Sequence, residues 1–521
     1  MQLLGLLAQQ TGRSEVAADL LSHAIAFEST DPMFYSYLGR IFHSLGRLDD
    51  SIAANMRALH LRPNCAQTYF HLALAHHQRG MLKEAAEFYR CALAADPDHA
   101  DACSNLGTIL QAENRLEAAI ELYRKSVSIA CGAAAFNNLS VALRSLGRLN
   151  EAVEAAKEAI AIDSRYALAH NNLGVAYMLQ NRFDEAATCW QRALELQPSM
   201  GEPHINLAMA WLLQGDYGRG WREYEWRWVA FPLKKPDFKE PQWHGEALDG
   251  KTILLYSEQG FGDILQFIRY APMVAQRGGR IVLHAHDELK RLLSPIKCLS
   301  QVVGASEHLP PFDVQIALMS LPMVFGTTLG DVPPPGDCIR ADDDLRATWK
   351  ERIDAAVESV GAHGKLKVGI AWAGRQAHDN DRNRSMTLAS FAPVAQVPGV
   401  QLFSLQKGEP AQQIRAAPAM MRIIDLTDGL SDFAETAAMV TNLDLIISVD
   451  TAVVHVAAAQ DLPVWTLLPF APDWRWLLDR PDTPWYPSMR LFRQTEHEQW
   501  RPVIEQVAGQ LRQLSGRPSP A

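Results

Sequence analysis

The chain has 521 residues, of which 48% are hydrophobic and 21% are charged, a composition typical of globular proteins with several domains. Its formal net charge of −10 argues against a nucleic-acid binder that works through a broad basic surface. The seven cysteines form no C-x-x-C pair, so we expect reduced thiols and a cytoplasmic location. Because no run of about 18 apolar residues occurs, we expect no transmembrane segment.

The first half of the chain repeats with a period of about 34 residues. Small residues occupy one column, at Gly5, Gly39, Ala73, Gly107, Ser140, Gly174 and Ala208. Glycine or asparagine follows seven positions later, at Gly12, Gly46, Gly80, Asn114, Gly147, Asn181 and Gly215. Small residues allow two helices of a hairpin to cross closely, and glycine or asparagine fits the left-handed turn between them. The pattern therefore predicts helical hairpins over residues 1–215, with one residue missing near position 130.

This pattern resembles the tetratricopeptide repeat, which implies an all-α superhelix with a groove for a protein or peptide partner. The array begins within a repeat, since residues 2–10 already have the pattern of a first helix, so we expect a segment upstream. Asparagines recur on the first helices of the hairpins, at Asn105, Asn137, Asn138, Asn171, Asn172 and Asn206. An amide ladder of this kind binds a peptide backbone without selecting its side chains, so we expect these residues to bind the acceptor. The alternative is that the amides are only solvated.

Residues 216–250 are aromatic and basic, and we interpret them as a capping helix followed by a linker. The aromatic side chains between Trp221 and Trp228 are expected to seal the end of the superhelix by packing. We expect the second half to fold without the residues that precede Pro236, because its two lobes have cores of their own.

From Lys251 onward, short apolar strands alternate with helices, the pattern of a doubly wound α/β fold. Strands are predicted at 252–256, 281–285, 313–317, 367–372, 401–404, 423–425, 445–449 and 464–468. A segment rich in Pro, Gly and Asp, followed by a helix over 345–360, divides this half into two Rossmann-like lobes, 251–344 and 345–521. The βαβ unit from Asp444 to Leu468 places the N-terminus of a helix at the carboxyl edge of a parallel sheet, where α/β folds bind phosphates.

Four segments of the second half are similar to the family-nine, heptosyltransferase-like glycosyltransferases. They are EQGFGD (258–263), GIAWAGRQAHDNDRNRSMTL (369–388), SLQKGE (404–409) and VDTAVVHVAAA (449–459). The resemblance implies the GT-B fold, a nucleotide-sugar donor and no cofactor besides that substrate. The fusion of repeats to such a domain also resembles bacterial protein glycosyltransferases, which implies a protein acceptor.

The resemblance assigns the general base to Asp263, at the carboxyl end of the first strand. An acceptor hydroxyl has a pKa far above neutral, so a carboxylate in the cleft has to take its proton. The alternative role of Asp263 is to cap a helix over 264–276, and one residue can serve both purposes.

The resemblance places the donor diphosphate at the helix that begins near Thr451, with Ala452 and Val453 in its first turn and His455 beyond. Heptosyltransferases usually have glycine where this chain has Ala452, which weakens any inference about the donor. The basic phosphate contact maps to Arg384, with Lys407 as a second candidate. Trp372 and Gly374, in the loop after the strand at 367–372, complete the predicted donor contacts.

Other motifs carry no predicted function. The acidic pair in Asp379-Asn380-Asp381 imitates the D-x-D metal motif but lies in a long basic loop, and His378 and His455 form no recognisable ligand pair, so no metal site is predicted. Trp474, Trp476 and Trp485 are expected to be buried rather than to stack on a sugar or base.

The sequence thus predicts a multidomain protein, a repeat superhelix followed by a GT-B domain, that transfers sugar to a protein held by the repeats. Two alternatives remain open. One is a repeat scaffold with a non-catalytic GT-B-like domain, and the other is a GT-B-fold sugar-nucleotide epimerase.

Overall fold

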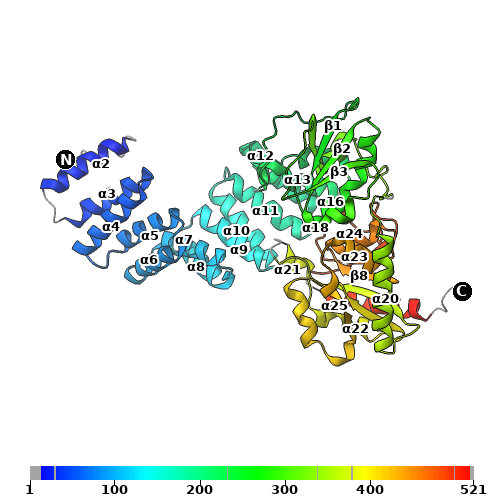
Figure 1. Ribbon diagram of the computed structural model, residues 1–521. Helices are drawn as coiled ribbons and strands as arrows, with labels where there is room; N and C mark the ends of the chain where they lie inside the picture. The colour runs from blue at the N-terminus through cyan, green and yellow to red at the C-terminus, as the bar shows by residue number, and fades with distance from the viewer. Residues whose placement is uncertain are drawn as a thin grey trace. The chain divides into compact units, whose positions relative to one another are not determined.

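The computed structural model describes residues 13–27, 31–231, 233–336, 338–376, 380–497 and 499–516. The chain divides into two compact units, Met1–Ser199 and Met200–Ala521 (Figure 1). The predicted helix over 2–10, together with His378 and Asp379, lies outside the described residues. Within the described part of the chain, no helix has the length and apolarity required to cross a membrane.

The first unit consists of helices of similar length that pack in pairs, as the repeat predicts. They are α2 (Ser14–Phe27), α3 (Pro32–Ser44), α4 (Leu48–Leu61), α5 (Ala66–Gln78), α6 (Leu82–Ala95), α7 (Ala100–Ala112), α8 (Leu116–Ile129), α9 (Ala133–Ser145), α10 (Leu149–Ile162), α11 (Ala167–Leu179) and α12 (Phe183–Leu196). The link between α8 and α9 is one residue shorter than the link between α6 and α7, which is where the sequence lacks a residue.

The two small-residue columns have the roles predicted for them. Gly46 and Gly80 adopt left-handed conformations with φ of 72° and 80°, and Asn114 does so with φ of 58°. A Cβ added at Gly174 would lie 2.5 Å from Nε1 of Trp190, so only glycine allows α11 and α12 to pack this closely. The hairpins are therefore specified by local sequence.

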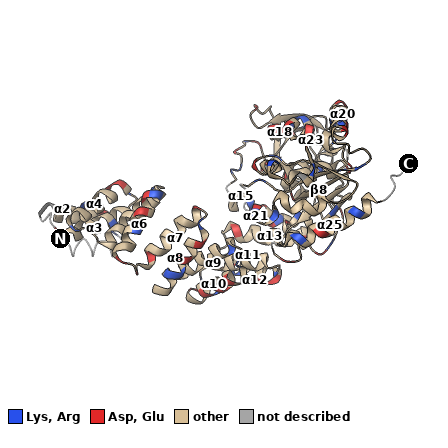
Figure 2. Cartoon of the chain, turned by 90° about the horizontal axis from the view of Figure 1, so that it is seen from below, with Lys and Arg blue, Asp and Glu red and all other residues tan. Residues whose placement is uncertain are grey.

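Charged residues of both signs lie interspersed along the repeat helices (Figure 2). Many form exposed pairs one turn apart, such as Arg148 with Glu151 at 2.7 Å. Glu151 also forms an ion pair with Arg124, at 2.7 Å, and this pair links α10 to α8 of the preceding helical hairpin. Exposed pairs of this kind contribute little stability, so the array depends on its apolar contacts.

The second unit begins with helices that the repeat pattern had assigned to the array and its cap. These are α13 (Gly201–Leu213), α14 (Tyr217–Tyr224) and α15 (Arg227–Ala230). Trp221 on α14 is 2% exposed and its ring centroid lies 5.2 Å from that of Trp474 and 6.0 Å from that of Phe267. The Nε1 of Trp485 donates to the hydroxyl of Tyr217 at 3.1 Å. The aromatic segment is thus a packing element, as predicted, but it belongs to the core of the second unit, which therefore does not begin near Pro236.

The N-terminal lobe contains a parallel sheet with strand order β3-β2-β1-β4. Its strands are β1 (Thr252–Tyr256), β2 (Arg280–Ala285), β3 (Leu299–Gly304) and β4 (Val314–Ala317), and its helices are α16 (Phe261–Phe267), α17 (Ala271–Ala275), α18 (Asp287–Leu293) and α19 (Leu321–Val324). The predicted single helix over 264–276 begins earlier, at Phe261, and is interrupted by a 3-10 turn over Ile268–Tyr270. Pro272 explains this break, because proline fits only the first turn of a helix.

The C-terminal lobe contains a parallel sheet with strand order β10-β9-β8-β5-β6-β7. Its strands are β5 (Leu366–Ala371), β6 (Val400–Ser404), β7 (Ile423–Asp425), β8 (Leu445–Val449), β9 (Val464–Leu468) and β10 (Met489–Arg493), and its helices are α20 (Asp343–Ser359), α21 (Asp381–Arg384), α22 (Ala392–Ala395), α23 (Phe433–Val440), α24 (Ala452–Ala459) and α25 (Trp500–Ser515). The chain order of the strands reverses between β5 and β8, and ligands of open α/β sheets bind at such a point. Two parallel α/β lobes agree with the predicted GT-B fold.

Eight of the strands were predicted, whereas β3 and β10 were missed. Both lie at the edge of a sheet and are partly exposed, which weakens the continuous apolar pattern that marks a buried parallel strand.

Candidate active site

The loop and helix after β1 position Asp263. Asp263 is the third residue of α16, and its Oδ2 accepts a hydrogen bond from the backbone N–H of Gly260 at 2.8 Å. It therefore caps its own helix from inside the first turn rather than from the N-cap position. Its Oδ1 forms an ion pair with Arg475, from the C-terminal lobe. Capping leaves lone pairs on both carboxylate oxygens, so the role does not exclude proton transfer.

The strand β8 and the helix α24 form the predicted phosphate-binding turn. Thr451 is the N-cap residue and has an extended backbone, and among the described residues no side chain caps this helix. The hydroxyl of Thr451 instead lies 3.1 Å from that of Ser448. Thr451, Ala452 and Val453 are half-buried, so the first backbone N–H groups of α24 face a partly open space. A helix N-terminus of this kind favours an anionic ligand.

The helices α16 and α24 pack against each other across the two lobes (Figure 1). A Cβ added at Gly262 would lie 3.0 Å from Cδ2 of His455, a tight contact, so glycine favours this close approach of the two helices. The His455 ring is 4% exposed, and its Nδ1 lies 2.9 Å from the hydroxyl of Tyr486. Burial lowers the pKa of His455 well below its ordinary value, so the ring is neutral. The fold thus brings Asp263, next to Gly262, close to the helix predicted to bind the donor.

Of the two predicted basic contacts, only Arg384 lies at this point of the sheet. Its Nη1 donates to the backbone oxygen of Asp450 at 3.3 Å, immediately before α24. A Cβ added at Gly374 would lie 2.6 Å from Nη2 of Arg384, so the guanidinium rests on the loop after β5. Lys407 follows β6, two strands from β8, and its Nζ donates to the backbone oxygen of Thr427 at 3.0 Å. The structure therefore groups Arg384, but not Lys407, with α24.

The loop after β5 is held by a residue that the sequence did not single out. The side-chain oxygen of Gln406 accepts hydrogen bonds from the backbone N–H groups of Trp372 and Ala373, both at 2.9 Å, and its Nε2 donates to the oxygen of Ala373 at 3.0 Å. Trp372 is fully buried, so its side chain packs in the core of the lobe rather than facing the loop surface. Gln406 lies within the SLQKGE segment, and this position was the signal from which the sequence could have identified it.

A second missed element is the turn Trp474–Trp476, which follows β9. Trp474 is 2% exposed, and Trp476 and Trp485 are both 0% exposed. The predicted burial of these three tryptophans is therefore confirmed. The Nε1 of Trp476 donates to Oδ2 of Asp450 at 2.8 Å, and burial raises the pKa of Asp450 above its ordinary value. The arginine between the two buried tryptophans was the available signal for a charged group in the interior.

The loop between β1 and α16 also carries a buried carboxylate, Glu258. Its Oε1 forms an ion pair with Nη2 of Arg227 at 3.0 Å, and Arg227 also donates to the hydroxyl of Ser320 at 2.7 Å. Burial raises the pKa of Glu258 to about 7, although the Arg227 charge opposes the rise. The next residue, Gln259, donates from Nε2 to the hydroxyl of Tyr224 at 3.2 Å. The helices α14 and α15 therefore hold the loop that leads to Asp263.

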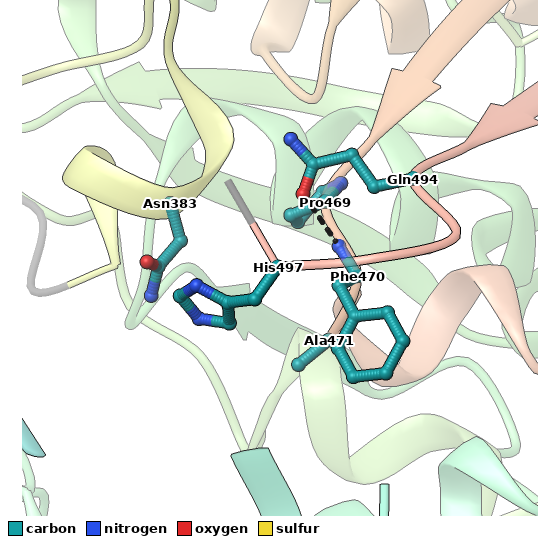
Figure 3. A pocket seen from close by; sticks show the side chains of 6 residues that line it. All are labelled: Asn383, Pro469, Phe470, Ala471, Gln494 and His497. Carbon is teal, nitrogen blue, oxygen red and sulfur yellow. Dashed lines mark hydrogen bonds between the residues drawn. The ribbon is translucent and has the colours of Figure 1, made fainter. Parts of the chain in front are cut away.

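A small, shallow pocket lies at the same carboxyl edge of the C-terminal sheet (Figure 3). It is lined by Asn383, Pro469, Phe470, Ala471, Gln494 and His497. Asn383 is the neighbour of Arg384, and the oxygen of Gln494 accepts from the backbone N–H of Phe470 at 3.1 Å (Figure 3). The pocket thus borders the arginine side of the donor region.

The predicted acceptor amides lie in both units. In the first unit, Nδ2 of Asn172 donates to Oδ1 of Asn137 on the preceding first helix, at 2.8 Å, and Asn172 is 8% exposed. Asn105 and Asn138 are half-buried, and Asn206 lies on α13 of the second unit. A hydrogen bond does link amides of successive repeats, and peptide binding by these residues stays a prediction.

Comparisons with known proteins agree with this division. Residues 389–476 match the model of glycosyltransferase family 9 (heptosyltransferase), a span that contains Lys407 and α24 and begins after Arg384. Tetratricopeptide-repeat models match residues 3–64, 76–129, 142–181 and 167–200. The chain thus contains segments that match tetratricopeptide-repeat models and a segment that matches the glycosyltransferase family 9 model, and the second match supports a glycosyltransferase activity in general.

Among individual proteins, the chain is similar to protein FlbA of Caulobacter vibrioides, with 26% identity over 96% of this chain and 83% of FlbA. Two solved structures resemble the repeats. YrrB, a tetratricopeptide-repeat protein with an unusual peptide-binding site, is 24% identical over 36% of this chain and 96% of its own, with a TM-score of 0.32. MamA is 25% identical over 31% of this chain and 95% of its own, with a TM-score of 0.29.

Proposed function

We propose that this protein is a cytoplasmic, inverting glycosyltransferase that transfers a sugar from a nucleotide-sugar donor to a protein acceptor bound by its repeats. The acceptor hydroxyl attacks the anomeric carbon, its proton passes to Asp263, and the bond to the leaving nucleoside diphosphate breaks. The observation that supports this proposal is the packing of α16, the helix that contains Asp263, on α24 of the facing lobe, where Gly262 lies against His455.

The charges on the C-terminal lobe suit a leaving diphosphate. The backbone N–H groups at Thr451, Ala452 and Val453 and the guanidinium of Arg384 surround the start of α24. These groups stabilise the negative charge that the diphosphate gains as the glycosidic bond breaks. On this proposal the protein supplies the positive charge from its own side chains and backbone, without a metal cofactor.

The repeat array supplies the acceptor site in this proposal. Tetratricopeptide repeats form an extended surface for peptides, and amides on successive first helices recognise a peptide backbone. The hydrogen bond from Asn172 to Asn137 joins amides of two successive repeats and supports this part of the proposal.

The test is transfer by the full chain from a panel of UDP-, GDP-, ADP- and CMP-linked sugars to a peptide array, measured as label incorporation and checked by intact mass. Asp263→Asn is expected to lower turnover by about 100-fold or more, the contribution of a general base, with nucleoside diphosphate affinity changed only a few-fold. Unchanged turnover would assign Asp263 to capping alone. No transfer from any donor, together with no calorimetric binding of UDP, GDP or ADP, would favour a scaffold with a non-catalytic domain.

A further inference from the structure

Arg475 is a buried cation that reaches from one lobe to the other. It lies in the 3-10 turn Trp474–Trp476 of the C-terminal lobe. Its Nε donates to Oε1 of Gln266 at 2.7 Å, and its Nη2 forms the ion pair with Asp263. Both partners belong to α16 of the N-terminal lobe. The remaining nitrogen, Nη1, pairs with Asp473 of its own lobe at 2.8 Å.

The surroundings keep this guanidinium in place and charged. Arg475 is 9% exposed and Gln266 is fully buried, and the guanidinium lies 4.6 Å from the centre of the Trp474 ring. Burial by itself lowers the pKa of Arg475, but the nearby carboxylates, Asp473 foremost, raise it above its ordinary value. The planar fork of arginine meets all three polar partners at once, which the single ammonium of lysine does not.

These contacts of Arg475 bear on the orientation of the Asp263 carboxylate. One of its oxygens is held by the N–H of Gly260 in its own lobe, and the other is held by Arg475 from the facing lobe. Its carboxylate is therefore oriented by two groups that approach from different directions. Only the first of them is present without the C-terminal lobe.

We propose that Arg475 is the positioning residue of the base: it orients the Asp263 carboxylate for proton transfer and makes that orientation depend on the packing of the two lobes. The inference rests on the proposed role of Asp263 as the base. It assigns to Arg475 no contact with the reacting atoms, so the donor binds without it.

The chain offers a matched control in Arg269. This arginine is 3% exposed, extends from the N-terminal lobe and donates from Nη1 to the backbone oxygen of Trp485 in the C-terminal lobe at 2.7 Å. It also joins the lobes, but in the part of the chain that the structure describes its hydrogen bonds go to the backbone oxygens of Gln266, Pro333 and Trp485 rather than to Asp263. A loss of lobe packing alone would affect variants of both arginines in the same way.

The experiment compares Arg475→Met, Arg475→Lys and Arg269→Met in the full chain. Turnover is measured as nucleotide release from the most active nucleotide sugar of the UDP-, GDP-, ADP- and CMP-linked panel with the peptide array mixture, and donor affinity is measured by calorimetry with the corresponding nucleotide. We expect kcat to fall about 100-fold in Arg475→Met, since misplacing a reacting group costs about that much. Arg475→Lys is expected to recover part of this loss and to remain about tenfold below the wild type, because lysine keeps the charge and loses the fork. Donor affinity should change only a few-fold in both, and kcat of Arg269→Met only a few-fold.

Three results would overturn the inference: wild-type kcat in Arg475→Lys, a loss confined to donor affinity, or an equal fall of kcat in Arg269→Met. Should Arg475→Met not fold, the lysine variant and the control decide by the same criteria. Asp263→Asn separates this inference from the proposed function. If that variant keeps wild-type turnover, the assignment of the base fails, whereas a slow Asp263→Asn with fully active Arg475 variants refutes only the role of Arg475.

Discussion

The two units of this chain use charged residues in opposite ways. In the repeats, ion pairs such as Arg148 with Glu151 join residues one turn apart and are 39% and 47% exposed at the side chain. In the second unit, Arg227 is fully buried and pairs with Glu225 and Glu258, while Arg475 joins residues that lie more than 200 positions apart. The difference teaches that the array is stabilised locally, whereas the candidate active site is held by buried charges that only the complete second unit assembles.

The largest expected effect is on the buried pair between Arg227 of α15 and Glu258 in the loop between β1 and α16. Arg227→Met leaves the buried Glu258 without its cation, and removal of one partner from a buried pair costs about 3–5 kcal/mol. All but Trp190 of the 13 tryptophans lie in the second unit, so tryptophan fluorescence during urea unfolding reports its stability.

Arg148→Met is the matched control in the repeats, because it breaks an exposed pair worth about 0–1 kcal/mol. Its unfolding transition should stay close to that of the wild type. Equal destabilisation by the two variants would break the contrast between local and long-range charge networks.

A smaller effect is expected on ligand binding within the second unit. If Arg384 contacts the diphosphate, Arg384→Ala should weaken binding of UDP, GDP or ADP by about 1.5–3 kcal/mol, the range for a hydrogen bond to a charged group. Lys407→Ala should have less effect, since Lys407 lies two strands from β8 and already donates to Thr427. Calorimetry on both variants checks this, and a loss confined to Lys407→Ala would move the phosphate contact to that lysine.

The last prediction concerns the pH dependence of stability. The pKa of Glu258 is raised from 4.5 to about 7 in the folded protein. A raised pKa means that stability is fully present at a pH below the unfolded value and is lost as the pH rises through the folded value. The second unit should therefore lose stability between about pH 4.5 and 7, by no more than about 1.4 kcal/mol per pH unit for this one group.

Glu258→Gln removes this titration and should flatten the dependence over the same interval. The measurement is the urea midpoint of tryptophan fluorescence at each pH, for the variant and the wild type. An identical slope in the two proteins would show that Glu258 is ionised throughout and that Arg227 outweighs its burial.

The sequence by itself determined the elements that depend on local contacts. The columns at Gly46 and Gly174 predicted the hairpins because a left-handed turn and a close helix crossing each require a particular residue type. The apolar runs predicted the buried parallel strands, including β8 and the helix that follows it. Because these strands and helices follow one another in a recognisable order, the sequence also placed Asp263 in the N-terminal lobe and α24 in the C-terminal lobe.

Only the tertiary structure decided which distant residues meet. It placed Arg384 at the start of α24 and Lys407 elsewhere, although both follow strands of one sheet. It also showed that α14 belongs to the core of the second unit and that Arg475 holds Asp263. No local pattern encodes these contacts, because the free energy of a buried charge depends on the partners that the fold supplies from remote parts of the chain.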